Sequence, residues 1–281
     1  MKAAYFEKTG PARDVLKIGD LPDPGPKAGE VLVRIRVSGV NPSDVKTRGG
    51  SSGRPSLGKV VVHNDGAGEI VAVGAGVKKS RVGERVWLHN TDWTKPLGTA
   101  AALVAAPAAN AEPLPDGYGF DEGACFGVPL LTAYHGVMVA GPVQGKTVFV
   151  TGGAGAVGHY AVQIAKAKGA TVIASVSSDA KAKAARDAGA DHTVNYRSED
   201  VPAAVAKITG GKGVDHYIEV NLSANGKMLD KLMATAGRIT VYGSDEALAA
   251  FESRALRVKQ AVMYFYNVYA LPPEVLRAAK A

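Results

Sequence analysis

Cysteine is nearly absent from the sequence, because Cys125 is the single cysteine among 281 residues. One cysteine excludes an intrachain disulfide and a cysteine-rich zinc site. Cys125 lies within an apolar run. We therefore expect a buried, inert thiol rather than a nucleophile.

Long apolar runs and blocks of one charge are also missing. No stretch approaches the ~18 uninterrupted apolar residues that a membrane-spanning helix needs. The N-terminus, MKAAYFEKTG, lacks the apolar core of a signal peptide. We expect a cytoplasmic protein without membrane contact. Lys and Arg exceed Asp and Glu by 33 to 26, but the excess is spread along the chain. Nucleic-acid binding is not expected without a basic patch, although the mild excess would attract an anionic cofactor.

The first 120 residues predict a β-rich domain. Apolar and polar residues alternate from Val31 to Val40, which is the period of a half-buried strand. Further strands are expected at 68–74 and 85–88, and clusters of Gly and Pro separate them. Short strands at this spacing favour a barrel or a sandwich. The alanine-rich stretch 100–111, which Pro107 interrupts, is expected on a surface segment.

Beyond residue 120 strands and helices alternate. A helix is expected to begin near 121, with Asp121 and Glu122 in its first turn. Strands are then expected at 146–151, 171–176, 191–195, 214–220, 238–242 and 261–266, and helices at 156–168, 179–188, 200–209 and 224–235. This rhythm predicts a doubly wound parallel sheet. The fold class is therefore α/β, with a β-rich domain in front of it.

A glycine-rich segment, VFVTGGAGAVG at 148–158, follows a predicted strand and opens a predicted helix. It contains the pattern Gly153-x-Gly155-x-x-Gly158. In a dinucleotide-binding turn, one glycine forms the tight turn, one lets the backbone approach the pyrophosphate, and one permits close helix–strand packing. The helix N-terminus attracts the phosphates. The predicted cofactor-binding residues of the turn are Gly152, Gly153, Ala154, Gly155, Ala156, Val157 and Gly158.

The residues after the next strand favour NADPH over NADH. NAD-binding proteins place an acidic residue there, about twenty residues beyond the glycines, to bind the ribose 2′-hydroxyl. The strand here ends in Ala174-Ser175-Val176-Ser177-Ser178, and the first carboxylate, Asp179, is interpreted as part of a helix N-cap. Hydroxyl groups beside Lys181 suit a 2′-phosphate. Taken alone, Lys181 would be interpreted as a solvated helix lysine.

Five further segments occur in a characteristic order: Asn41-Pro42-Ser43-Asp44, HNDGAGEIVAVGAGV at 63–77, Arg81 to Trp87, Pro129 to Tyr134, and Asn195 to Asp200. In that order the chain resembles the zinc-free, zeta-crystallin-like quinone oxidoreductases of the medium-chain dehydrogenase/reductase superfamily. The resemblance covers nearly the whole chain. It implies a GroES-like catalytic domain at 1–120 and a Rossmann NADPH-binding domain at 121–266, with the cofactor in a cleft.

The resemblance also implies roles for single residues. Ser177, Lys181 and Tyr196 would surround the 2′-phosphate. Asn41 and Thr132 would lie near the nicotinamide and position the reactants, and no general acid is assigned. Residues that end strands at the carboxyl edge of the sheet are further candidates for cofactor binding: Asn221, Tyr242 and Gly243.

The resemblance implies a homodimer as well, formed by pairing of edge strands at 261–269, although an internal strand fits that sequence equally well. Residues 267–281 would begin a return to the catalytic domain, and the chain looks truncated there. Many relatives carry tyrosines after the Asn41 motif, where this chain has Lys46 and Ser51-Ser52. Trp87 and Trp93 are candidates for the wall of the cleft, although core packing is favoured for Trp87.

Zinc is not expected. Zinc-dependent relatives place Cys where this chain has Ser43 and Asp44, and His-Glu where it has His63-Asn64-Asp65. A catalytic zinc needs about three protein ligands, and no third ligand is evident. Without a Lewis acid to stabilise an alkoxide, hydride delivery to a quinone or an α,β-unsaturated carbonyl is favoured. The alternatives are an enoyl-thioester reductase of the same superfamily and a non-enzymatic NADPH-binding protein with a crystallin-like or RNA-binding role.

We expect the protein to bind NADPH more tightly than NADH. The substitution Lys181→Ala should weaken NADPH binding by about tenfold, because it removes a charged partner of the 2′-phosphate. Titration with each cofactor, followed by the quenching and blue shift of its fluorescence, measures both effects. Equal affinity for the two cofactors in the unaltered protein would contradict the 2′-phosphate assignment.

Overall fold

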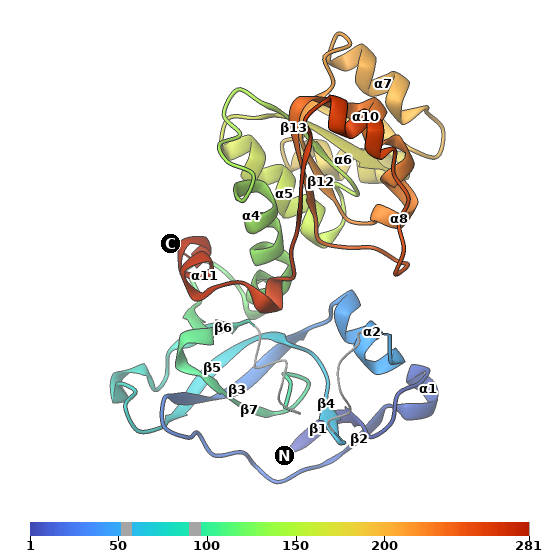
Figure 1. The fold of residues 1–281 in the computed structure, drawn as a ribbon. Coiled ribbons are helices and arrows are strands. Elements are labelled where there is room, and N and C mark those ends of the chain that lie inside the picture. The colour runs from blue at the N-terminus through green and yellow to red at the C-terminus, as the bar shows by residue number, and fades with distance from the viewer. Residues whose placement is uncertain (52–57, 90–96, 281) are drawn as a thin grey trace. The chain divides into compact units, whose positions relative to one another are not determined.

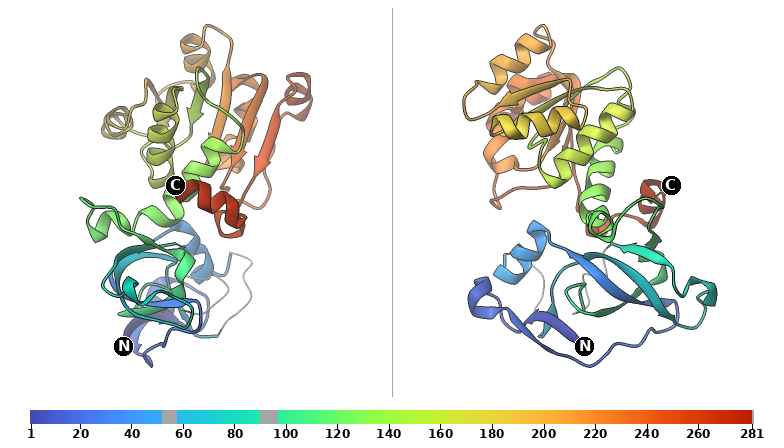
Figure 2. Two further views of the ribbon diagram at one scale, coloured as in Figure 1. Left: turned by 90° about the vertical axis from the view of Figure 1, so that its left-hand side faces the viewer. Right: turned by 180° about the vertical axis from the view of Figure 1, so that it is seen from behind.

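The computed structural model describes residues 1–51, 58–89 and 97–280. The chain forms two compact units, Met1–Pro129 and Leu130–Ala281, which are drawn in Figures 1 and 2. We call them the N-terminal unit and the C-terminal unit. Trp93, a candidate for the wall of the cleft, and Ser52, from the segment after the Asn41 motif, lie outside the described residues.

The N-terminal unit is built from antiparallel strands, as the GroES-like prediction requires. A five-stranded sheet has the order β7-β3-β5-β6-β8, and a three-stranded sheet has the order β2-β1-β4. The strands are β1 (Lys2–Phe6), β2 (Lys17–Asp20), β3 (Glu30–Gly39), β4 (Val60–Val61), β5 (Asp65–Val73), β6 (Arg85–Leu88), β7 (Leu103–Pro107) and β8 (Ala111–Pro113). Its helices are α1 (Ala12–Val15), α2 (Pro42–Gly49) and α3 (Phe120–Gly123), with short 3-10 turns at Lys79–Arg81 and Ala108–Asn110.

The core of this unit is formed by alternate residues along its strands, because successive side chains of a strand point to opposite faces of the sheet. Val31 and Val33 of β3 are fully buried, and they pack with Ile70, Val86 and Leu88 from the neighbouring strands. Trp87 is 6% exposed and packs edge-on against Phe126, with ring centroids 6.0 Å apart. Its predicted place in the core is therefore confirmed.

The alanine-rich stretch 100–111 was wrongly expected on a surface segment. Its residues from Leu103 to Pro107 form β7, which pairs with β3, and Val104 and Ala106 are buried. Small apolar side chains at every second position fill the core face of the strand. Pro107 is tolerated because β7 lies at the edge of its sheet and Pro107 ends the strand.

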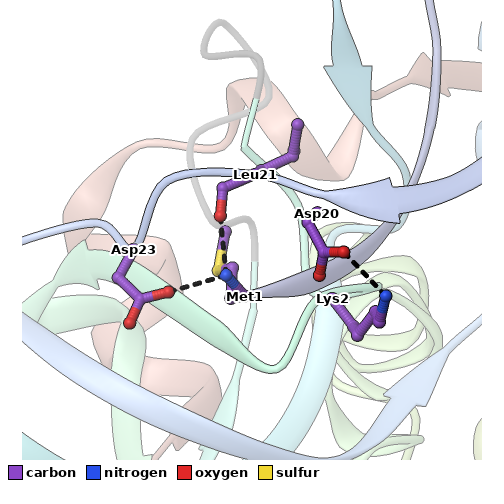
Figure 3. A network of polar contacts seen from close by, with 5 residues as sticks. All are labelled: Met1, Lys2, Asp20, Leu21 and Asp23. Carbon is purple, nitrogen blue, oxygen red and sulfur yellow. Dashed lines mark hydrogen bonds and ion pairs between the residues drawn. The ribbon is translucent and has the colours of Figure 1, made fainter.

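The first strand is tied down at its beginning (Figure 3). The Met1 ammonium donates a hydrogen bond to the Leu21 carbonyl at 2.6 Å and pairs with the Asp23 carboxylate at 2.7 Å. Lys2 and Asp20, which face each other in the β1–β2 register, form an ion pair of 2.8 Å. Both side chains of that pair are exposed, so it fixes register more than it adds stability.

The C-terminal unit has a six-stranded parallel sheet of order β11-β10-β9-β12-β13-β14. The strands are β9 (Thr147–Val150), β10 (Thr171–Val176), β11 (His192–Asn195), β12 (Val214–Glu219), β13 (Met233–Val241) and β14 (Val262–Phe265). The chain runs outward from β9 through β10 to β11 and then returns to the other side of β9. The doubly wound Rossmann prediction is therefore confirmed, with the switch point between β9 and β12.

Helices cover both faces of this sheet (Figure 2). Val148 and Val150 of β9 point to one face, whose cluster includes α4 and α5 residues, and Phe149 points to the other. The helices are α4 (Leu131–Met138), α5 (Ala156–Ala167), α6 (Asp179–Asp187), α7 (Val201–Ile208), α8 (Leu222–Asn225), α9 (Leu229–Leu232), α10 (Ser253–Val258) and α11 (Pro273–Lys280). A π-helical turn spans Phe126–Leu130, and 3-10 turns span Gly226–Met228 and Val268–Ala270.

One predicted helix of this unit was wrong in its extent. The expected helix 224–235 is instead the short helices α8 and α9 around a 3-10 turn, and Met233 already begins β13. A β-carbon on Gly226 would lie 2.4 Å from the Ala250 carbonyl oxygen, so a neighbouring loop passes over the break. Leu229, Leu232 and Met233 are all buried, and such an apolar run does not reveal where helix becomes strand.

The strand expected at 261–269 is β14, which is shorter than expected. It lies at the edge of the sheet and pairs only with β13 among the described strands, so its predicted edge position is confirmed.

Cys125 was wrongly expected to be buried. The turn after α3 directs Gly123 and Ala124 inward and leaves the Cys125 side chain exposed. Partial burial, and then the carboxylates of Asp65 and Asp121, raise the pKa of its thiol. Within the described residues, no helix combines the length and apolar character needed to cross a membrane.

Stability should depend on pH through His216 of β12, which is 3% exposed. Burial, and then the Arg238 guanidinium, lower the pKa of this imidazole from 6.5 to about 4, against the effect of the Gly136 carbonyl. The folded state therefore binds fewer protons than the unfolded state between these values. The contribution of His216 is fully present above pH 6.5 and is lost as the pH falls toward 4.

We expect this loss to amount to about 2–3 kcal/mol of unfolding free energy. Urea unfolding of the wild type and of His216→Gln, measured at about pH 7.5 and about pH 4.5, isolates the effect. The variant should lose less stability on acidification than the wild type. An identical pH dependence in both proteins would show that His216 is not held neutral.

Candidate functional site

The glycine-rich turn connects β9 to α5, and three of its glycines are sterically required. Gly152 has φ of +63°, in the left-handed region. A β-carbon on Gly153 would lie 2.5 Å from the β-carbon of Ala174, and one on Gly158 would lie 2.2 Å from the Gly152 carbonyl oxygen. No side chain larger than hydrogen fits at Gly153 or Gly158 unless the helix and the strand move apart.

Hydrogen bonds hold the turn between the ends of two other strands. The amides of Gly152 and Gly153 donate to the hydroxyl and the carbonyl of Ser175, at 3.1 and 3.0 Å. On the other side, the Thr151 hydroxyl donates to the Ile218 carbonyl at 2.9 Å and accepts from the Val220 amide at 2.9 Å. The turn is therefore fixed at the switch point of the sheet, where ligands of such folds bind.

The N-terminus of α5 faces the end of this turn. Gly155 is the N-cap residue, and no side chain caps the helix. The helix has 12 residues and no acidic residue in its first turn. Its first amide groups and its dipole therefore favour a phosphate there. Ala154, Ala156 and Val157 add only small apolar side chains to this end.

The three residues expected around a 2′-phosphate come from neighbouring strand ends. Ser177 follows β10 and is 9% exposed, whereas Tyr196 follows β11 and is 51% exposed. The Tyr196 amide donates to the Val176 carbonyl at 3.0 Å, which brings its segment beside the end of β10. Lys181 lies exposed in the first turn of α6.

The N-cap of α6 is Ser178, whose hydroxyl accepts from the Lys181 amide at 3.3 Å. Asp179 was wrongly interpreted as the cap and is instead the first helical residue. The described residues include no acidic partner for the Lys181 ammonium. Lys183 on the same helix pairs with Asp187 at 2.6 Å, so Lys183→Ala is a matched control for Lys181→Ala.

At the end of β12, the Asn221 amide is engaged by the protein itself. Its nitrogen donates to the Asp245 carboxylate at 2.6 Å, and its oxygen accepts from the Ser223 hydroxyl at 2.8 Å and from the Asp245 amide at 3.1 Å. These bonds join the turn after β12 to the loop after β13. Asn221 therefore orders two loops at this edge of the sheet.

Glu219, which sequence reasoning missed, lies fully buried at the end of β12. One carboxylate oxygen accepts hydrogen bonds from the main-chain amide of Asn221 at 2.5 Å and from the Asn225 side chain at 3.0 Å. Burial raises the pKa of this carboxyl above its ordinary value, against those hydrogen bonds. A carboxylate near the carboxyl end of the predicted strand 214–220, where such sheets bind ligands, was the signal that could have identified it.

Tyr242 and Gly243 lie directly after β13. A β-carbon on Gly243 would lie 2.1 Å from the Val220 carbonyl oxygen. Thr132 of α4 is 5% exposed, and its main-chain carbonyl accepts a hydrogen bond from the Tyr266 hydroxyl at 2.7 Å. The rings of Tyr242 and Tyr266 are 6.3 Å apart. Tyr266, which was not predicted, therefore connects Thr132 with Tyr242.

In the N-terminal unit, Asn41 belongs to a buried polar cluster. Its side-chain amide donates to the Asp65 carboxylate at 2.7 Å, and its main-chain amide donates to Asp44 at 2.8 Å. Asn64 donates to the other oxygen of Asp44 at 2.9 Å. Asp65 also accepts from the Val128 amide at 2.8 Å. Asn41 is thus oriented by two carboxylates.

Asp65 is the most perturbed group of this cluster. Its burial is nearly complete, and that burial raises the pKa of the carboxyl to about 7 despite the hydrogen bonds from Asn41 and Val128. The Asp44 carboxylate raises it further. A β-carbon on Gly127 would lie 2.2 Å from the second carboxylate oxygen of Asp65, so Gly127 makes room for it. Neither Asp65 nor Asp44 was predicted as a site residue.

The donor set of the cluster does not fit zinc. Asp44 and Asp65 are engaged by amide donors, and His63 shares its Nδ1 with the Ser38 hydroxyl at 2.8 Å. Within residues 1–51, 58–89 and 97–280, no group of three or more His, Cys, Asp and Glu side chains is arranged to hold a metal ion.

Known proteins match both units. Residues 27–116 match the alcohol dehydrogenase GroES-like domain, and residues 156–280 match the family described as zinc-binding dehydrogenase. Human quinone oxidoreductase is 32% identical over 241 residues, which are 85% of this chain and 71% of that protein. The 2-haloacrylate reductase of a Burkholderia species is 34% identical over 255 residues, 89% of this chain and 74% of that protein.

Solved structures agree with these matches. The crystal structure of Escherichia coli quinone oxidoreductase complexed with NADPH superposes with a TM-score of 0.87 at 26% sequence identity. The superposition covers 99% of this chain and 85% of that chain.

The substitution Gly158→Ala should destabilise the C-terminal unit. Its new β-carbon would contact the Gly152 carbonyl oxygen, which is backbone and cannot rotate away. We expect a loss of about 1–3 kcal/mol of unfolding free energy, as for other overpacked sites. Gly49→Ala is the control, because a β-carbon there has no neighbour within 4 Å. Equal stability of the two variants would contradict the close approach.

Proposed function

The chain belongs to the quinone oxidoreductase family of the medium-chain dehydrogenase/reductase superfamily and is an oxidoreductase, and on that premise we propose that it transfers hydride from NADPH to a quinone or an α,β-unsaturated carbonyl. The observation that carries the proposal is the glycine turn at the switch point. Only glycine fits at Gly153 and Gly158, and the helix that follows presents its uncapped N-terminus.

A nicotinamide dinucleotide fits these residues. The turn from Gly152 to Gly158 would hold the pyrophosphate, because backbone amides and a helix dipole are what phosphates require. The cofactor supplies the hydride when it is bound. Thr132 would lie beside the nicotinamide, held in place by the bond from Tyr266 to its carbonyl. Asn41 would act from the N-terminal unit, where Asp65 orients its amide.

The preference for NADPH is supported by three residues. Ser177 and Tyr196 offer hydroxyl groups at the ends of β10 and β11, and Lys181 offers a cation with no acidic partner among the described residues. The residues directly after β10, Ser177 and Ser178, carry no carboxylate for a ribose 2′-hydroxyl, and the next residue, Asp179, is the first of α6. The NADPH complex of the Escherichia coli relative agrees with this preference.

A conjugated acceptor is supported by the two relatives. One is named for quinones and the other for 2-haloacrylate. A quinone contains C=C bonds conjugated with carbonyl groups, and a 2-haloacrylate contains a C=C bond conjugated with a carboxylate. An enoyl-thioester acceptor is the alternative, but it would need a cationic cluster for the carrier arm, and the sequence has no basic block.

We further propose that residues 1–120 form the catalytic domain, residues 121–266 the cofactor domain, and 267–281 a return toward the catalytic domain. The chain is proposed to act in the cytoplasm as a homodimer joined through β14. Exposed apolar side chains on that edge strand support the pairing, because Phe265 is 65% exposed and Val262 37%.

The purified protein should oxidise NADPH when duroquinone is added, with a kcat on the order of 1–100 s⁻¹. Absorbance at the wavelength of the reduced nicotinamide measures the rate. Prior treatment with a chelator should leave the rate unchanged, because no zinc is required in the proposed reaction. If the protein binds NADPH but reduces neither duroquinone nor enones, the non-enzymatic alternative is favoured. Loss of the rate after chelation would contradict the zinc-free reaction.

A further inference from the structure

His63 has a backbone conformation that is uncommon for any residue other than glycine. It lies in the short connection between β4 and β5, and its φ is +75°, in the left-handed region. Two other non-glycine residues in the described part of the chain have a positive φ, and each has a local reason. Gln260 follows the C-cap of α10, and Ala236 lies where the register of β13 shifts. His63 ends no helix, so its surroundings must hold it.

The main chain around His63 is fixed by a neighbouring segment. The His63 carbonyl accepts a hydrogen bond from the Thr99 amide at 3.0 Å, and the Val62 carbonyl accepts one from the Ala100 amide at 3.0 Å. A β-carbon on Gly98 would lie 2.2 Å from the His63 carbonyl oxygen. These bonds and this close approach keep the connection in a conformation that a free chain would leave.

The ring of His63 starts a chain of hydrogen bonds whose direction can be assigned. The Thr99 hydroxyl donates to the main-chain carbonyl of Asp65, which can only accept. The Ser38 hydroxyl, 2.9 Å from the Thr99 hydroxyl, must then donate to it, because the single Thr99 hydrogen is used. By the same reasoning, Nδ1 of His63, which is 2.8 Å from the Ser38 hydroxyl, donates to Ser38. The hydrogen of the neutral ring is therefore on Nδ1.

The ring of His63 is uncharged at neutral pH. Burial lowers the pKa of this imidazole below its ordinary value, against the effect of the Asp44 carboxylate. A neutral ring with its hydrogen on Nδ1 fixes the position of residue 63 without adding a charge to the cluster around Asp44 and Asp65.

The two residues after His63 are directed to the same place. Asn64 donates to the Asp44 carboxylate at 2.9 Å, and Asp65 accepts from the Asn41 side-chain amide at 2.7 Å. Asn41 and Asp44 are joined at the beginning of α2, where the main-chain amide of Asn41 donates to Asp44 at 2.8 Å. Successive side chains of a straight strand would face opposite ways. The bend that brings both side chains to α2 contains the left-handed residue His63.

We propose that His63 is a positioning residue for the hydride transfer. Its left-handed backbone and its bond to Ser38 hold residues 64 and 65 against the beginning of α2, and those two residues hold the side-chain amide of Asn41 in one orientation. The inference rests on the proposed function, in which Asn41 acts beside the nicotinamide. In this role His63 transfers no proton.

Two substitutions separate the two ring nitrogens of His63. In His63→Asn the side-chain nitrogen lies close to the place of Nδ1, and asparagine tolerates a positive φ. In His63→Gln the side-chain nitrogen lies closer to the place of Nε2, so Ser38 loses its donor. His63→Asn should therefore keep the positioning, and His63→Gln should lose it. His192→Gln, at the exposed beginning of β11, is the control for a histidine elsewhere in the chain.

In His63→Gln we expect kcat with duroquinone to fall about 10- to 100-fold, because a slightly displaced positioning group costs this much. KM for duroquinone and the dissociation constant of NADPH should stay within about twofold. His63→Asn and His192→Gln should keep kcat within about twofold of the wild type. An unchanged kcat in His63→Gln would overturn the proposal. A fall in His63→Asn as large as that in His63→Gln, or larger, would also overturn it, because the ring and not the bond from Nδ1 would then be required.

The substitution Asn41→Ala tests whether His63 acts through Asn41. In that background, His63→Gln should lower kcat by less than about twofold, because the group that His63 positions is already missing. A fall as large as the one in the wild-type background would show that His63 acts independently of Asn41, and the proposal would have to be withdrawn.

A readout that needs no turnover separates this inference from the proposed function. In protein with isotopically labelled asparagine, the NMR signal of the Asn41 side-chain amide is the one that Asn41→Ala lacks. This signal should move in His63→Gln and stay in place in His63→Asn. If it moves as expected but the wild type does not reduce duroquinone, the proposed function fails while the positioning of Asn41 stands. If the wild type reduces duroquinone and the signal does not move, the positioning fails alone.

A further variant keeps the test informative if His63→Gln does not fold, which its melting temperature reveals. Ser38→Ala breaks the same chain of hydrogen bonds without changing residue 63. It should lower kcat and move the Asn41 signal as His63→Gln does. If Ser38→Ala folds and leaves both unchanged, the bond from His63 to Ser38 does not position Asn41.

Discussion

The close approach of α5 to the end of β9 is the constraint on which the rest of the site depends. Gly158 lies against the Gly152 carbonyl, and Gly153 lies against Ala174 of the neighbouring strand. Because no side chain separates these backbones, the helix begins directly at the switch point of the sheet. The N-terminal amides of α5 then point to the place where strand order reverses, and a dinucleotide can be held there by backbone alone.

Polar groups at the strand ends fix the loops around this point. Ser175 and Thr151 hold the glycine turn, and Glu219 and Asn221 hold the turn after β12. In the N-terminal unit, Asp65 and Asp44 hold Asn41 in the same way. Each of these side chains is engaged by the protein, which makes the sites rigid. The ammonium of Lys181 differs, because the described residues offer no acidic partner for it, and this group is the one we assign to a ligand.

Local patterns predicted the elements well where one period dominated. The alternation at 31–40 and the apolar strands at 146–151 and 171–176 became β3, β9 and β10, with no end shifted by more than one residue. The prediction of a helix at 224–235 was wrong because an apolar run fits both the helical and the strand period. The prediction of a surface segment at 100–111 was wrong because alanine packs in a strand as readily as it covers a surface. The prediction that Cys125 is buried was wrong because a turn, which has no periodic pattern, sets the direction of its side chain. Asp65, Glu219 and Tyr266 act through partners that are distant in sequence, so their roles appear only once the strands are assembled.

The transfer of hydride from a bound nicotinamide to a conjugated acceptor can be followed with an isotope label. NADPH deuterated on one face of C4 can be incubated with the protein and cyclohex-2-enone in ordinary water, and the saturated ketone can be examined by mass spectrometry and NMR. We expect one deuterium at the β carbon, from one of the two NADPH stereoisomers and not from the other. A ketone product without deuterium from either stereoisomer, or no ketone product while NADPH remains bound, would contradict hydride transfer by this protein.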